Sequence, residues 1–105
     1  MTQDADKEKK DLEFRAMADS FIDVANKHCD TTDAAQVGST LLYATSRFSA
    51  FVVASHAKDK ASYEAEIDNA VEYFGTEFKR MLMENLGQYK SVFDEAPRYE
   101  HLIKK

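Results

Sequence analysis

The first group of side chains that could do chemistry comprises His28, Cys29 and Asn85. An imidazole is the group of the three whose proton equilibrium lies near neutral pH. His28 and Asn85 fall within the apolar arcs of two expected helices, and short antiparallel connections would bring them to the same level. Because buried polar groups need hydrogen-bond partners, we predict a buried polar pair between His28 and Asn85 that fixes the helix register. The alternative is a small site that all three residues form at one end of the molecule.

Catalysis and metal binding fit this group poorly. His28 and Cys29 are adjacent on a helix, where neighbouring side chains point about 100° apart, and no third group is placed to orient the imidazole. Cys29, His28 and His101 would supply three zinc ligands, whereas a structural zinc site normally has four. We therefore predict no catalytic residues, no metal and no cofactor.

Arg47 is the second candidate. An interhelical ion pair with Glu13 or Glu66 would explain it without any ligand. The functional alternative is a site for a small anionic ligand that Arg47 forms with Tyr43 and Tyr73, because a guanidinium group binds carboxylates and phosphates through two parallel hydrogen bonds.

The elements that position these side chains are expected to be helices. Apolar residues recur at steps of three and four residues, which is typical of amphipathic helices. The predicted helices run from about Asp11 to His28, from Asp33 to Ala57, and from Ser62 to Leu86 or beyond. The fold class is therefore all-α, an antiparallel three-helix bundle with a long third helix. The expected core contains Phe21, Leu41, Phe48, Phe74 and Phe78.

The central helix carries a single charge, Arg47, between Ala34 and Ser55. One side of its helical wheel is strongly apolar, and a second side holds small residues that allow another helix to approach closely. A helix with two packing faces belongs in the middle of an assembly.

Helix boundaries follow from capping residues. Asp33 with Gln36 reads as a capping box for the central helix, and Asp59 or Ser62 can cap the third. Gly87 leaves two alternatives, a continuous third helix or a break followed by a short fourth helix. The predicted domains are a flexible polar arm at residues 1–10, a helical bundle domain at 11–95 and a loose C-terminal tail at 96–105.

Composition excludes several classes of partner. The net charge is −5 and no cluster of Lys and Arg is present, which argues against nucleic-acid binding. Arg47 in the middle of the least charged stretch argues against a membrane span. A single cysteine and the lack of an apolar signal segment at the N-terminus favour the cytoplasm.

Several helical segments carry a family resemblance. They are Phe21–Asn26, Tyr43–Ala50, Glu72–Phe74, Arg80–Leu86, Tyr89 and Phe93–Asp94. Together they resemble a family of small uncharacterised proteobacterial proteins, classed as domain of unknown function 3144, over roughly residues 14–94. The resemblance implies a bacterial cytoplasmic setting, and it brings no activity, cofactor or partner with it.

The sequence does not specify a biochemical function. An unbroken third helix would extend past the first and expose Tyr89, Val92 and Phe93, and exposed apolar surface of this kind usually marks an interface. We therefore predict a homodimer, with an unidentified protein as the alternative partner. The favoured function is a non-enzymatic, self-associating protein-interaction module, and the alternative is a binder of small anions or a minor enzyme using Arg47, Tyr43 and Tyr73.

Overall fold

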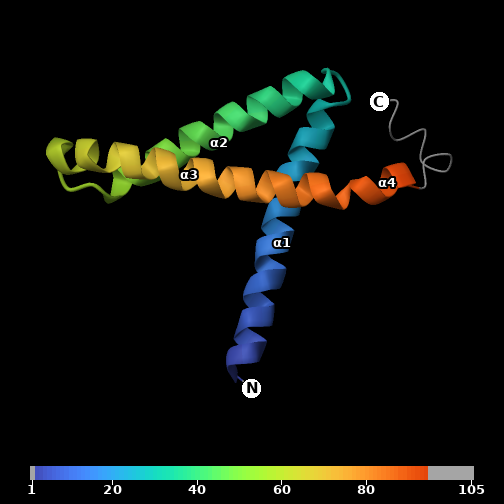
Figure 1. Cartoon of the computed structure of the whole chain (residues 1–105), viewed down its shortest axis with the longest axis horizontal. Coiled ribbons are helices and arrows are strands. Elements are labelled where there is room, and N and C mark those ends of the chain that lie inside the picture. Colours follow the sequence, from blue (N-terminus) through green and yellow to red (C-terminus); the bar gives the residue numbers. More distant parts are fainter. Residues whose placement is uncertain (1, 95–105) are drawn as a thin grey trace. The chain divides into compact units, whose positions relative to one another are not determined.

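The computed structural model describes residues 2–94, and these are almost entirely helical (Figure 1). The helices are α1 (Thr2–His28), α2 (Ala34–His56), α3 (Lys60–Gln88) and the short α4 (Lys90–Asp94). Within the described range no strand occurs, so the predicted all-α class with a long third helix is confirmed. The predicted tail at 96–105 lies outside the described residues.

The first helix is longer than predicted. It begins at Thr2, so residues 2–10, expected to be a flexible arm, are helical. The sequence here is rich in Lys, Glu, Asp and Ala, and residues of opposite charge stand three and four positions apart. Such spacings favour a helix without any tertiary contact, and the lack of large apolar residues in this segment does not end the helix.

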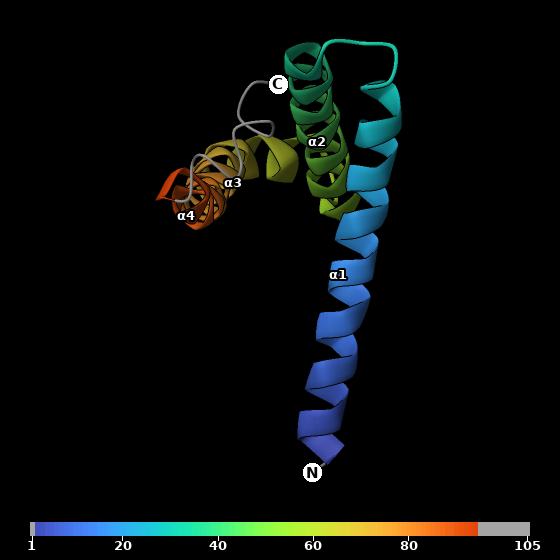
Figure 2. The same cartoon turned by 90° about the vertical axis from the view of Figure 1, so that its right-hand side faces the viewer.

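The chain divides into two compact units, Met1–Val52 and Val53–Lys105, each of which is described separately. In the first unit, the C-terminal end of α1 and the N-terminal end of α2 adjoin the turn that connects them, and the two helices diverge away from it (Figures 1 and 2). In the second unit, α4 follows α3 directly after Tyr89 and contacts its end. The antiparallel packing of the three long helices stays a prediction.

The start of α3 is fixed by a capping box. The backbone N–H of Ser62 donates to the Asp59 carboxylate at 2.8 Å, and the backbone N–H of Asp59 donates to the Ser62 hydroxyl at 3.2 Å. This confirms Asp59 as the helix cap. The hydrogen bond from the backbone N–H of Ser62 also lowers the pKa of the Asp59 carboxyl, because it stabilises the charged form.

The end of α3 decides between the two alternatives at Gly87. The helix passes through Gly87 with ordinary helical backbone and ends at Gln88, with Tyr89 as its C-cap. The short α4 follows, so a fourth helix is present as in the second alternative, but the break lies at Tyr89 and not at Gly87.

Most large apolar side chains are exposed in the single chain. Val37 is the only buried apolar residue among those described. Of the expected core residues, Phe48 is 66% exposed, Phe21 is 61% exposed and Phe74 is 38% exposed. The prediction that these residues are buried in a core is therefore wrong for the single chain. The helices have the apolar faces that the sequence indicates, but within the units described here those faces are not covered.

Candidate functional site

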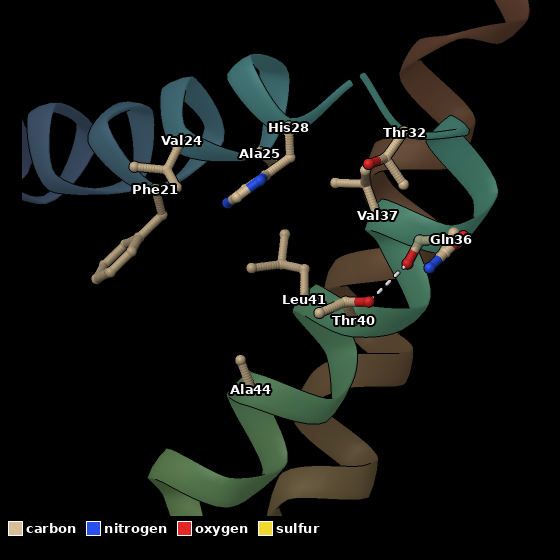
Figure 3. A pocket seen from close by; sticks show the side chains of 10 residues that line it. All are labelled: Phe21, Val24, Ala25, His28, Thr32, Gln36, Val37, Thr40, Leu41 and Ala44. Atoms are coloured by element: carbon tan, nitrogen blue, oxygen red, sulfur yellow. Dashed lines mark hydrogen bonds between the residues drawn. The ribbon is translucent and has the colours of Figure 1, made fainter. Parts of the chain in front are cut away.

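A groove lies beside the turn that joins α1 to α2, entirely within the first unit. Its volume is about 510 Å³. Its lining is mainly apolar, and it consists of Phe21, Val24, Ala25, His28, Thr32, Gln36, Val37, Thr40, Leu41 and Ala44 (Figure 3). The groove is therefore an apolar recess that the two helices of this unit offer to a partner or ligand.

The turn beside the groove is held by backbone hydrogen bonds. The carbonyl of His28 accepts from the N–H groups of both Thr31 and Thr32, at 3.2 and 3.0 Å. The N–H of Val37 donates to the carbonyl of Asp33 at 3.0 Å, which forms the first turn of α2. These bonds satisfy groups that the ends of two helices would otherwise leave unpaired, so the turn positions both walls of the groove.

His28 is the titratable group of this groove. Its imidazole points from α1 into the space between the helices, toward Leu41 (Figure 3). Polar groups are otherwise few, and the Thr40 hydroxyl donates to its own helix at the Gln36 carbonyl, 2.8 Å away. The groove therefore presents one imidazole on an apolar surface, which suits an apolar side chain or ligand better than an anion.

The sequence identified His28 but not the groove around it. Cys29 is exposed and is not part of the lining. Asn85 is an exposed residue of α3 in the second unit, so the predicted pair with His28 stays a prediction. The signal for the groove was available in the apolar residues that α1 and α2 place on either side of the turn.

The second candidate site is spread over both units. Arg47 and Tyr43 are exposed one helical turn apart on α2. Arg47 has no ion pair with Glu13 in the described part of the first unit. Tyr73 belongs to α3, where its ring packs edge-on against Phe74 with ring centroids 5.2 Å apart. The three-residue ligand site stays a prediction.

The predicted interface residues lie at the end of the second unit. The side chain of Tyr89 is 67% exposed and that of Phe93 is 60% exposed, whereas Val92 is half-buried. Tyr89 stands at the break between α3 and α4, and its carbonyl accepts from the N–H of Val92 at 3.1 Å. Two aromatic rings are thus exposed on neighbouring turns at the end of the described chain.

Ion pairs in the described residues are concentrated on α3. The Arg80 guanidinium contacts the carboxylates of Glu77 at 2.9 Å and Glu84 at 3.1 Å, and Lys60 lies 3.8 Å from Glu64. Arg80 lowers the pKa of Glu77 by donating a hydrogen bond to its charged form. All of these side chains face solvent, and their contacts support the helix rather than a site.

Comparison with models of known protein families shows to which family the chain belongs. The model of a family described as protein of unknown function (DUF3144) matches residues 14–90. The chain belongs to the DUF3144 family. The DUF3144 region includes the groove, Arg47 and the whole of α3, and it leaves out the charged beginning of α1 and most of α4. Neither the curated proteins nor the solved structures gave a match.

Among residues 2–94, no cluster of His, Cys, Asp or Glu is suited to hold a metal ion. The helices of this range also include none with the length and apolar character that crossing a membrane requires.

Proposed function

We propose that this DUF3144 protein is a non-enzymatic interaction module that self-associates through its apolar helix faces. The observation that supports the proposal is the exposure of large apolar side chains on all three long helices, with Val37 alone buried among the described residues. Exposed apolar patches of this extent are rare on monomeric proteins. A two-fold homodimer is the commonest assembly that buries such a surface.

The setting that we propose is the bacterial cytoplasm. The single cysteine supports it, because a protein with one cysteine cannot form an internal disulfide.

The experiment is a measurement of mass in solution. The chain has a mass of 11.9 kDa, so light scattering at micromolar concentration should give about twice that value for a homodimer. Phe93→Asp places a charge in the predicted interface and should lower the measured mass, whereas Asp94→Asn, its neighbour in α4, should not. A mass of 11.9 kDa throughout the accessible concentration range would reject self-association and leave a different protein as the partner.

The alternative function is binding of a small anion by Arg47 with Tyr43 and Tyr73. One observation favours it: Arg47 lacks a carboxylate partner in the described part of its own unit. Calorimetric titration with inorganic phosphate and with acetate tests this function. Binding that is lost in Arg47→Met would support an anion site. The absence of a heat of binding with either anion would exclude this function.

A further inference from the structure

The helix α3 carries a seam that resembles one strand of a coiled coil. The seam consists of Val71, Gly75, Phe78 and Leu82, which follow one another at steps of four, three and four residues. This alternation places all four on one side of the helix, as at the core positions of a heptad repeat. All four are exposed in the structure, and Val71 is 68% exposed. The seam is thus available for a partner helix.

The glycine in this seam is unusual, because a core position normally carries a large apolar side chain. A Cβ atom at Gly75 would meet no other atom within 4 Å, so nothing in the unit that contains α3 requires a glycine there. Its backbone is ordinary helix, and a glycine costs a helix about 1 kcal/mol relative to alanine. The residue therefore needs an explanation outside its own unit, and a large side chain from a partner that occupies this space would supply one.

Two charged side chains that flank the seam have no ion-pair partner in their own unit. The cations of α3 are Lys60, Lys79 and Arg80. Lys60 and Arg80 have carboxylate partners on their own helix, whereas Lys79 has no ion pair with any of residues 53–94, the described part of its unit. Glu72 also has none in that range, and it flanks the same side of the seam, two turns before Lys79. Glu72 and Lys79 thus occupy the same position in successive heptads. Glu72 lies before the midpoint of the seam and Lys79 lies after it.

We propose that α3 pairs with α3 of a second copy of the chain in antiparallel orientation, centred between Gly75 and Phe78. In this register the partner's Phe78 lies over Gly75, and the partner's Leu82 lies beside Val71. Glu72 then faces the partner's Lys79, and two-fold symmetry repeats the pair. Glycine leaves room for the phenyl ring in two equivalent places, and each unpaired charge gains an opposite one.

A parallel pair would not use these features. It would place Gly75 against the partner's Gly75, which leaves a cavity, and Phe78 against the partner's Phe78. Glu72 and Lys79 would face apolar positions such as the partner's Phe74. The antiparallel pair instead brings Phe74 to the partner's Met81, which continues the apolar contact on the other side of the seam.

This inference rests on the proposed self-association, and disulfide trapping tests it separately. In a Cys29→Ser background, Val71→Cys and Leu82→Cys proteins are prepared singly, mixed and oxidised. Antiparallel pairing predicts a covalent heterodimer between the two variants and little homodimer of either. Homodimers of each variant without the heterodimer would overturn the antiparallel arrangement. A dimer by light scattering that gives no crosslink at all would overturn the α3 interface while retaining self-association, whereas a monomer would reject both.

Charge exchange gives an independent readout. Lys79→Glu creates two repulsive pairs per dimer and should weaken dimerisation about 5- to 30-fold. Glu72→Lys should do the same, and the double variant Glu72→Lys with Lys79→Glu should recover most of the loss. Lys10→Glu, an equal change of charge on α1, serves as the control and should leave the dissociation constant unchanged. Failure of the double variant to recover affinity would exclude contact between these two residues across the interface.

Discussion

Replacing Gly75 with leucine should have opposite effects on the single helix and on the dimer. No atom lies within 4 Å of a Cβ at this position, so the new side chain meets no obstacle in its own chain. Leucine favours helix over glycine by about 0.8 kcal/mol, and the monomer should therefore become more helical. In the antiparallel pair, by contrast, the leucine would occupy the space that we assign to the partner's Phe78.

The magnitude follows from the symmetry of the pair. The gain in helix propensity is present in both monomer and dimer, so it cancels in the dissociation constant when α3 is already helical. Overpacking costs about 1 to 3 kcal/mol per site, and each dimer contains two sites. Even the lower value gives about 2 kcal/mol, which corresponds to a dissociation constant about 30-fold weaker.

Sedimentation over a dilution series measures the dissociation constant, and circular dichroism at the lowest concentration measures the helicity of the monomer. Gly87→Leu is the matched control, because a Cβ at Gly87 also meets nothing within 4 Å and Gly87 lies outside the seam. It should leave the dissociation constant unchanged. An equal or tighter dimer for Gly75→Leu would refute the assignment of Phe78 to this space.

Two further predictions concern the cap of α3 and the expected polar pair. The lowered pKa of Asp59 means that its carboxylate stabilises α3 above the ordinary value of 3.8, and that this contribution is lost as pH falls through the lower pKa of the folded state. The difference in helicity between the wild-type protein and Asp59→Asn should therefore change at a pH below 3.8, and a change centred above that value would contradict the hydrogen bond to Ser62. For His28 and Asn85, a double-mutant cycle with His28→Leu and Asn85→Leu should give a coupling energy above about 0.5 kcal/mol if the side chains touch. Additive effects on the free energy of unfolding would exclude the pair.

Sequence reasoning succeeded where the structure is local. The end of α1 at His28 and the cap at Asp59 each depend on residues a few positions apart, whose chemistry the sequence displays directly. It failed at the beginning of α1, because apolar periodicity gives no signal in a helical segment made mainly of charged residues. It also failed for the core. An apolar arc indicates that a helix face is suited to burial, but it does not show which segment or molecule packs against that face. Phe48 has the expected position on its arc and is nevertheless exposed in the single chain.

The early start of α1 at Thr2 makes its first turns sensitive to ionic strength. Asp6 and Lys10 are four residues apart, as are Lys7 and Asp11, and residues 2–11 contain no large apolar side chain that could anchor them. Attraction between exposed charges is screened by salt, and the Debye length falls from about 30 Å at 0.01 M to about 3 Å at 1 M. The start of α1 should therefore unwind at salt concentrations that strengthen apolar contacts between copies of α3. High salt would then shorten one helix while favouring association through another.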